Sequence, residues 1–224
     1  MVKRTLTFTT PMRSKKKRKT TVVTMNKSVK MIGGVTGGPL GLNQKAKLIY
    51  STKATISPST SIVYSLNSVY DPLTAIGGHQ PRGLDQLFAM FDAATVIGTR
   101  FEVWAVSEGE PVLLTVMCKD TADTITDYRD AMENGYSKHK IIGPQGTDGG
   151  TIMFDINPNK YLGRSHPLSD PQLKNSAVNG PAEQLYCHIH NTNMKANGDT
   201  GTLNIIIKIT YTTIFHEPKT APIS

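Results

Sequence analysis

The sequence predicts an all-β protein, in which one antiparallel sandwich carries a basic arm at its N-terminus. Three observations lead to this prediction. Eight separate stretches are expected to be strands, and most of them alternate hydrophobic and polar residues with period two. The 19 glycines and 13 prolines supply many turns, and the expected strands do not alternate regularly with helices, as they would around a parallel sheet. A chain of 224 residues suits one large domain of this kind plus a tail.

The longest alternating stretches lie at 97–105 and 203–211. Phe101 and Val103 fall on one side of the first stretch, and Ile207 and Ile209 fall on one side of the second, so each strand is expected to bury one face. The last strand is expected to be long. The other expected strands cover residues 45–50, 61–66, 112–118, 137–142, 151–156 and 184–191.

Two short helices are expected between these strands. The first is indicated by a stripe of four apolar residues with helical spacing, which are Leu84, Leu87, Phe88 and Phe91. This helix is expected to lead directly into the strand that begins at Ile97. A second helix within 123–132 is indicated by the spacing of Ile125, Tyr128 and Met132.

Positive charge is concentrated in the first 30 residues. They contain ten Lys and Arg and no Asp or Glu, so the rest of the chain has 25 − 10 = 15 bases against 17 acids, a net charge of −2. A block of like charges with few apolar residues cannot build a core, so it is expected to be disordered when free. The predicted divisions are a nucleic-acid-binding arm at 1–30, a Gly-rich hinge at 31–44, the sandwich at 45–217 and a tail at 218–224.

The arm suits a polyanion, because Lys and Arg at this density neutralise phosphates without reading sequence. Two basic clusters separated by ten residues also resemble a two-part nuclear localisation signal, which implies a nuclear import receptor as a partner. Its residues are Lys3, Arg4, Lys15, Lys16, Lys17, Arg18 and Lys19. The candidate nucleic-acid contacts are these seven together with Arg13, Lys27, Lys30, Lys45 and Lys47. A solvated tail that only aids solubility is the alternative.

Further nucleic-acid contacts are possible on the body. Arg100 and Lys208 lie on the polar sides of their strands, as Lys45 and Lys47 do, and they are secondary candidates if these strands share a sheet that faces the nucleic acid. Trp104 and Tyr64 have aromatic faces that could stack on bases, although a packing role is the preferred interpretation of both residues.

No active site, metal site or cofactor is expected. Cys187-His188-Ile189-His190 places two imidazoles on one side of a strand, as in metal-binding cupins, but no carboxylate follows at the required spacing. The preferred interpretation is a histidine pair on a sheet face or at a subunit contact. Cys118 and Cys187 are expected to be buried thiols. The apolar runs are too short for a membrane helix, and no secretory signal is present, so a cytosolic start and no membrane partner are expected.

One stretch resembles a known family. Pro81-Arg82-Gly83-Leu84-Asp85-Gln86, then Phe91, Val96-Ile97-Gly98 and the strand at 100–103 are similar to a stretch in capsid proteins of small circular single-stranded DNA viruses. The similarity covers about two dozen residues. This chain has Leu84 where Phe is usual and Phe91 where Tyr is common, and both keep a packing role.

The resemblance implies an eight-stranded jelly roll whose strands, labelled B to I, pair in the orders B-I-D-G and C-H-E-F. It also implies a viral coat protein that forms a small icosahedral shell of roughly 60 copies, packages single-stranded DNA, assembles in the host nucleus and ends in the virion. Two alternatives are a cellular nuclear protein whose sandwich binds a protein partner while its tail binds nucleic acid, and a cupin-type metalloenzyme.

Overall fold

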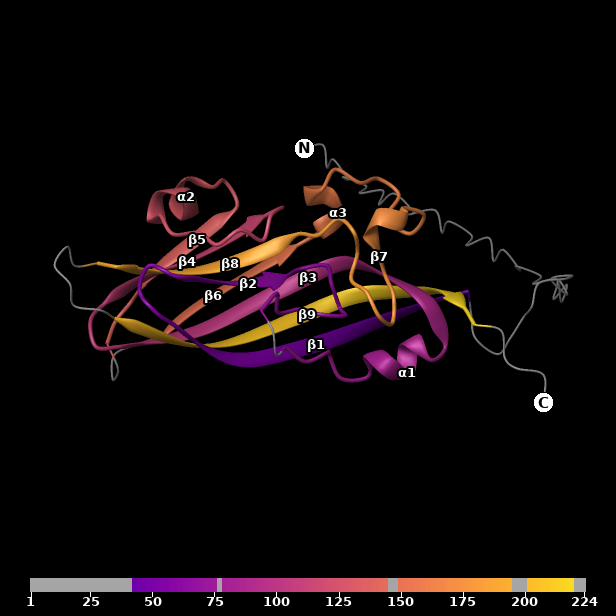
Figure 1. Cartoon of the computed structure of the whole chain (residues 1–224), viewed down its shortest axis with the longest axis horizontal. Coiled ribbons are helices and arrows are strands. Elements are labelled where there is room, and N and C mark those ends of the chain that lie inside the picture. Colours follow the sequence, from indigo (N-terminus) through magenta and orange to yellow (C-terminus); the bar gives the residue numbers. More distant parts are fainter. Residues whose placement is uncertain (1–41, 76–77, 145–148, 195–200, 220–224) are drawn as a thin grey trace, which may run out of the picture. The chain divides into compact units, whose positions relative to one another are not determined.

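The structure is a computed structural model that describes residues 42–75, 78–144, 149–194 and 201–219. The described residues form a sandwich of two antiparallel sheets (Figure 1), so the predicted all-β fold class is confirmed. The basic arm at 1–30 and most of the predicted hinge lie outside the described residues. No described helix is long and apolar enough to cross a membrane.

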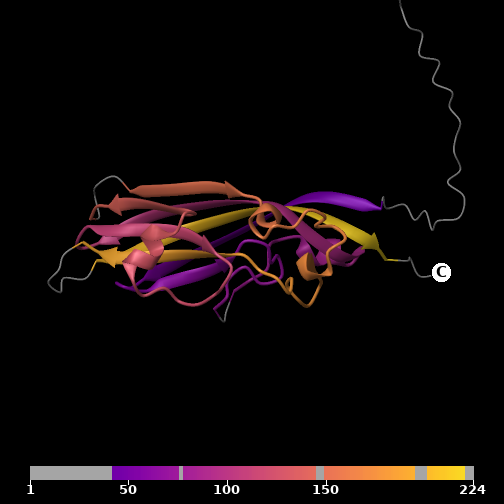
Figure 2. The same ribbon diagram turned by 90° about the horizontal axis from the view of Figure 1, so that it is seen from above.

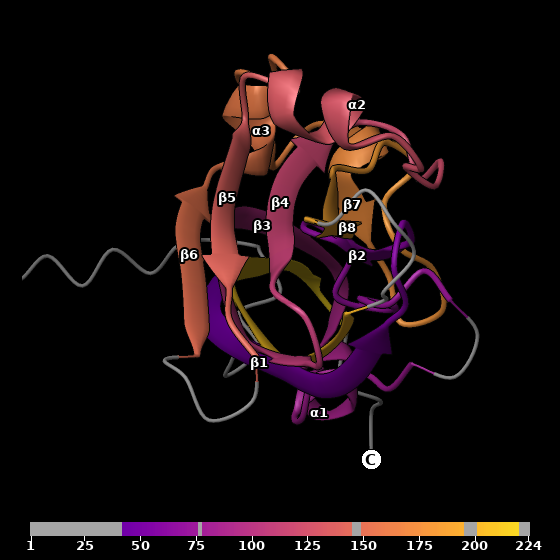
Figure 3. The ribbon, with the colours of Figure 1, turned by 90° about the vertical axis from the view of Figure 1, so that its left-hand side faces the viewer.

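Strands of both sheets run along the length of the sandwich (Figures 1 and 2), and a view along it shows the two sheets as separate layers (Figure 3). The five-stranded sheet contains β1 (Asn43–Ile56), β9 (Thr202–Pro218), β3 (Phe91–Glu108) and β6 (Gly150–Ile156), with the two-residue β7 (Lys174–Asn175) beside β3. The four-stranded sheet contains β2 (Ser61–Ser65), β8 (Tyr186–Asn193), β4 (Val112–Lys119) and β5 (Ser137–Ile142).

The strand orders are β1-β9-β3-β6 and β2-β8-β4-β5. If the eight longer strands are labelled B to I in chain order and β7 is left out, these orders are B-I-D-G and C-H-E-F. This is the jelly roll expected from the resemblance. The first and last strands pair from Asn43 opposite His216 to Ile56 opposite Leu203, so the two ends of the body lie in one sheet.

The core lies between the sheets and follows the predicted alternation. Phe101 and Val103 of β3 and Ile207 and Ile209 of β9 are all buried, and Phe101 stacks on Phe154 of β6 with 5.3 Å between the ring centroids. Burial of each such side chain contributes roughly 1.5–3 kcal/mol. Hydrogen bonds also join the two sheets, because the Tyr211 hydroxyl donates to the Ser65 carbonyl oxygen (2.7 Å) and the Thr99 hydroxyl donates to that of Leu66 (2.5 Å).

The predicted boundary between the first helix and the third strand is wrong. The helix α1 (Leu84–Phe88) ends earlier than expected, and Phe91 begins β3 instead of closing the helical stripe. Leu84, Phe88 and Phe91 are buried, as predicted, whereas Leu87 is half-buried. Residues 93–96 are buried in succession, and a bulge follows between Val96 and Gly98, so this part of β3 lacks the alternation that would have marked it as strand.

The second helix is shorter than predicted and uses a different face. The helix α2 (Tyr128–Glu133) begins after Asp127, whose side chain accepts a hydrogen bond from the Arg129 backbone N–H (2.9 Å). Tyr128 and Met132 are exposed, and Ala131 is the buried residue of the helix. Three short elements were not predicted, which are α3 (Pro158–Tyr161), the 3₁₀ turn η1 (Pro171–Leu173) and β7.

Candidate nucleic-acid interface

The outward side of the five-stranded sheet has positively charged and apolar side chains at its surface. We call this side the cationic face and define it by outward residues of four strands: Lys45, Lys47, Ile49, Ser51 and Lys53 of β1, Ile206, Lys208, Thr210 and Thr212 of β9, Gly98, Arg100, Glu102, Trp104 and Val106 of β3, and Thr151, Met153 and Asp155 of β6. They share one side because successive strand residues point to opposite faces.

Strand register arranges these residues in rows that cross the sheet. One row is Lys53, Ile206, Trp104 and Thr151, the next is Ser51, Lys208, Glu102 and Met153, and the third is Ile49, Thr210, Arg100 and Asp155. Lys47, Thr212 and Gly98 form a fourth row. Four of the positive charges predicted to share a sheet, those of Lys45, Lys47, Arg100 and Lys208, therefore do lie on one face.

Carboxylates partly neutralise two of these cations. The Glu102 side chain is nearly buried, and its oxygens lie 3.5 Å from Arg100 Nε and 3.2 Å from Lys208 Nζ. Asp155 Oδ2 lies 3.9 Å from Arg100 Nη1. These ion pairs reduce the positive potential above β3 and β9, so Arg100 and Lys208 are expected to attract an anion less than their exposure suggests.

Uncompensated positive charge lies along β1. Lys45, Lys47 and Lys53 are exposed, and within the described ranges no carboxylate lies within salt-bridge distance of any of them. β1 is also an edge strand, since it pairs only with β9 in the described part of the sheet. Lys53 was not among the predicted contacts, although the alternation that selected Lys45 and Lys47 continues through it.

Trp104 lies beside a hollow in the cationic face. The cavity measures about 370 Å³ and is bordered by Trp104, Val106 and Ile206 from β3 and β9, by Lys53 from β1 and by Thr151 from β6. Trp104 is 39% exposed, so its ring can be reached from solvent. Tyr64 is only 1% exposed and lies in the core, so the stacking role considered for it is wrong.

A second hollow, of about 450 Å³, lies along the same face, and its lining is more polar. Lys47 and Arg100 contribute positive charge, Thr210 and Thr212 contribute hydroxyls, and Asp155 contributes a carboxylate. Gly98, at the bulge of β3, leaves the sheet surface open there, since the nearest atom to a Cβ built on it would be 4.0 Å away. The cationic face is therefore hollowed at two places along its length.

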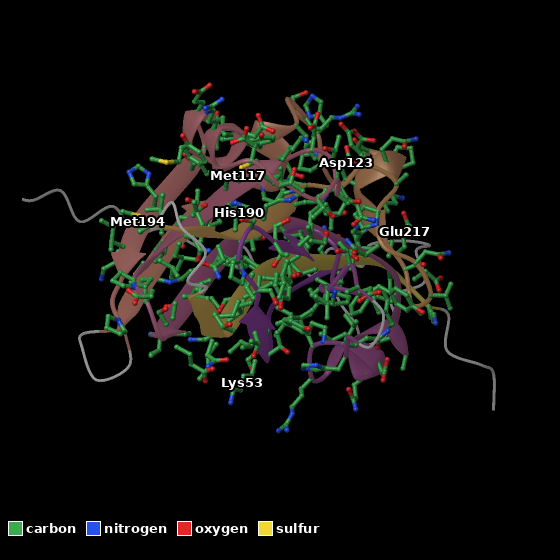
Figure 4. All side chains as sticks on the ribbon, turned by 60° about the vertical axis from the view of Figure 1, so that its left-hand side comes forward. Lys53, Met117, Asp123, His190, Met194 and Glu217 are labelled. Atoms are coloured by element: carbon green, nitrogen blue, oxygen red, sulfur yellow. The ribbon has the colours of Figure 1, made fainter. Side chains whose placement is uncertain are left out.

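The opposite sheet has a covered outer side. Thr115 and Met117 of β4 and His188 and His190 of β8 point away from the core and are buried by the connection between β4 and β5. We call these four residues the covered face. Figure 4 shows His190 inside the molecule and Lys53 directed outward. The expected histidine pair thus lies on a sheet face, but it is not accessible.

Burial lowers the pKa of both histidines below the usual value. Nε2 of His188 lies 2.8 Å from the Thr121 carbonyl oxygen, an acceptor, so Nε2 carries the proton and Nδ1 is left without a partner. Nδ1 of His190 is likewise buried and unpartnered. The described residues contain no group of three or more His, Cys, Asp or Glu placed to hold a metal ion.

Both cysteines are free and buried, as predicted. Burial raises the pKa of the Cys118 thiol to about 12 and also raises that of Cys187, so neither is a ready nucleophile at neutral pH. The arm residues predicted to bind nucleic acid and to direct nuclear import all lie outside the described residues: Lys3, Arg4, Arg13, Lys15, Lys16, Lys17, Arg18, Lys19, Lys27 and Lys30.

Comparison with known proteins gives distant structural similarities. No family model matches the chain, and no curated protein matches it. The empty head of turnip yellow mosaic virus aligns with a TM-score of 0.45 and 12% identity over 99% of this chain and 94% of the other. Mud crab tombus-like virus aligns with a TM-score of 0.44 and 14% identity over 85% and 98%.

The decameric BFDV capsid protein aligns with a TM-score of 0.38 and 12% identity over 78% of this chain and 99% of the other. All three similarities are too weak to assign a function, and the strand order of the chain itself is the firmer basis for describing its fold.

Proposed function

We propose that this chain is a viral coat protein that assembles with copies of itself into a small icosahedral shell and packages single-stranded DNA through its basic arm. The observation that carries the proposal is the jelly-roll strand order, B-I-D-G and C-H-E-F, in a chain whose first 30 residues hold ten basic residues and no acid. A nearly neutral body suits protein–protein assembly, and a polycationic arm suits a polyanionic cargo.

Charge arithmetic supports a packaging role. With ten positive charges per arm, roughly 60 copies in a closed shell bring about 600 positive charges to the nucleic acid. Phosphate neutralisation does not depend on base sequence, so one coat protein can enclose any strand of suitable length.

The cationic face extends this charge onto the body. β1 is the first strand after the arm and the hinge, and its outward side carries Lys45, Lys47 and Lys53 without carboxylate partners in the described ranges. We therefore infer that the five-stranded sheet faces the packaged strand, with the arm providing most of the binding and β1 providing a smaller part.

The proposed locations of the protein are the host nucleus, during assembly, and the virion. Lys3-Arg4 and the cluster at 15–19 would be recognised by a nuclear import receptor, which would bring the coat protein to the DNA. The role is structural rather than enzymatic. A fluorescent fusion too large to diffuse through the nuclear pore should enter the nucleus with the arm and stay outside without it.

Sedimentation of the purified full-length protein tests the proposal, with electron microscopy as a second observation. Closed particles of uniform size, formed with or without added single-stranded DNA, are expected. A species no larger than a few subunits under all assembly conditions would contradict the proposal and favour a cellular nuclear protein that binds nucleic acid and a protein partner. A stoichiometric bound metal would favour the cupin-type enzyme instead.

A further inference from the structure

Trp104 has an unusual position for an aromatic residue, because it lies on the outward side of a sheet and not in the core. The Trp104 side chain is 39% exposed. Two exposed apolar side chains lie next to it: Ile206 of β9, directly opposite in the strand register, and Val106, two residues further along β3. Together the three side chains form an apolar platform on the cationic face, whose other exposed apolar residues, Ile49 and Met153, lie in different rows of the sheet.

The platform borders the hollow of about 370 Å³, so a ligand that contacts the three apolar side chains can also enter the hollow. Lys53 lines the same hollow and has no ion-pair partner in the described ranges. A positive charge at the rim of an apolar hollow, beside an accessible indole, suits a ligand that combines a flat ring with an anionic group. A nucleotide within a single strand has both parts.

Neighbouring polar groups favour binding without base selection. Asn204 also lines the hollow, but its side chain is already engaged: Thr55 Oγ1 donates to its Oδ1 (2.8 Å), and its Nδ2 donates to Glu108 Oε1 (2.5 Å). An amide held on both sides is poorly placed to form paired hydrogen bonds with one particular base. The Thr151 hydroxyl also lines the hollow, but a hydroxyl can both donate and accept and so suits any base. Stacking is therefore the main interaction, and every base can stack.

We propose that the hollow beside Trp104 holds one base of a single-stranded nucleic acid, stacked on the indole, with an adjacent phosphate on Lys53. From there the backbone follows β1 toward Lys47, six residues or roughly 20 Å away along an extended strand. This inference rests on the proposed packaging function, and it adds a contact that depends on bases to the charge-only binding expected of the arm.

The chain contains a single tryptophan, so its fluorescence reports on this hollow alone. The full-length protein is titrated with an oligothymidylate that carries a remote label and, separately, with an abasic strand of the same length. Anisotropy of the label measures binding, and tryptophan emission measures stacking. Quenching of Trp104 by the oligothymidylate and little quenching by the abasic strand are expected, with both strands bound.

Variants separate stacking from charge. Trp104→Leu should weaken binding of the oligothymidylate roughly fivefold to a hundredfold and leave the abasic strand unaffected, because stacking on an aromatic ring is lost. Trp104→Phe should retain most of the affinity. Lys53→Gln should weaken the binding of both strands by a similar factor. Lys160→Gln, at an exposed lysine of α3 that does not line the hollow, is the matched control and should have no effect.

Equal tryptophan responses to the two strands would overturn the inference, and so would unchanged affinity in Trp104→Leu. If both strands bind with no tryptophan response, this inference fails while the arm-based packaging function stands. If the full-length protein binds neither strand, both fail. The fluorescence comparison needs no variant, so it decides the question even if a substitution prevents folding.

Discussion

The two sheets of the sandwich share their packing principle and differ in what lies on their outer sides. The five-stranded sheet leaves Trp104 accessible, together with three β1 lysines that have no carboxylate partner among the described residues. The four-stranded sheet buries His188 and His190 beneath the connection between β4 and β5. In Figures 1 and 3, α2 of that connection lies over the four-stranded sheet. A jelly roll has two outer faces. In the described residues, the connection between β4 and β5 covers part of the outer face of the four-stranded sheet, whereas the outer face of the five-stranded sheet is open to a ligand.

The nature of the buried groups reinforces this difference. On the covered face, Met117 packs with Ile125 and Ala131 of the connection, and the Ser61 hydroxyl accepts a hydrogen bond from the Ile125 backbone N–H (3.1 Å). These contacts fix the connection to the sheet. On the cationic face, Glu102 compensates the charge of two cations, whereas no carboxylate of the described ranges pairs with the lysines of β1.

Removing residues 1–30 is expected to have the largest effect on nucleic-acid binding. Because the arm holds ten basic residues, its loss should lower the affinity for single-stranded DNA by orders of magnitude and reduce the salt slope by up to about 7. DNA titrations of both proteins at several salt concentrations measure this. If the truncated body binds as tightly and with the same slope, the genome contacts lie on the cationic face and the arm is dispensable.

A substitution at a residue packed against the core side of the five-stranded sheet should lower stability far more than one on its outer side. Phe88 is buried and meets Phe215 of β9 edge to face, with 5.4 Å between the ring centroids, so Phe88→Ala should lower the free energy of unfolding by roughly 3–5 kcal/mol. Ile49→Ala, on the exposed cationic face, is the control and should change it by less than about 0.5 kcal/mol. Denaturant unfolding compares them, and equal losses would show that the outer face is also packed.

Acid should loosen the covered face and leave the cationic face unchanged. Burial lowers the pKa of both histidines. For His188, Lys119 adds to this lowering, and the Thr121 backbone and the Asp123 carboxylate partly oppose it. For His190, the backbone groups of Ile125 and Thr60 and the Asp127 carboxylate partly oppose it. The closed form binds fewer protons than the open form, whose histidines titrate near 6.5. Docking should therefore weaken as the pH falls below about 6.5, and the loss should end at the lowered pKa values.

Hydrogen exchange of residues 120–136 between pH 7.5 and pH 5, corrected for intrinsic rates, measures this opening. Each unit of pKa lowering corresponds to about 1.4 kcal/mol of docking free energy per histidine. The His188→Gln/His190→Gln double variant should lose the pH dependence, and His139→Gln, on the exposed side of β5, should keep it. An identical pH response in wild type and double variant would rule out the histidines as its source.

The smallest expected effect is the loss of DNA affinity when one cation of the cationic face is removed. It should depend on whether that cation is paired with a carboxylate in the described residues. Lys47→Gln should weaken DNA binding a few-fold at low salt and reduce the salt slope by about 0.7, the value for one phosphate contact with a single strand. Lys208→Gln should do less, because Glu102 already neutralises part of that charge. Equal effects would show that the ion pair opens when the strand binds.

Local periodicity was sufficient to predict most of the β-strands. The alternation at 203–211 marked the buried side of β9 correctly, and the alternation around Lys45 and Lys47 placed both residues on an exposed side. Period-two patterns survive in the sequence wherever one side of a strand meets the core and the other meets water. The charge split between arm and body also follows from the sequence, because it needs only counting.

Only the tertiary structure decided which candidate contacts on the body are exposed and which are buried or paired with a carboxylate. The alternation placed Tyr64 on the apolar side of its strand and Trp104 on the polar side, but only the packing of the sheets shows that Tyr64 is enclosed in the core while Trp104 is exposed beside a hollow. Compensation of Arg100 by Glu102 depends on side-chain geometry, and that of Lys208 depends on the register between β3 and β9, which no local pattern encodes. Burial of the histidines depends on a connection folding back over β8, a long-range contact determined by the complete fold.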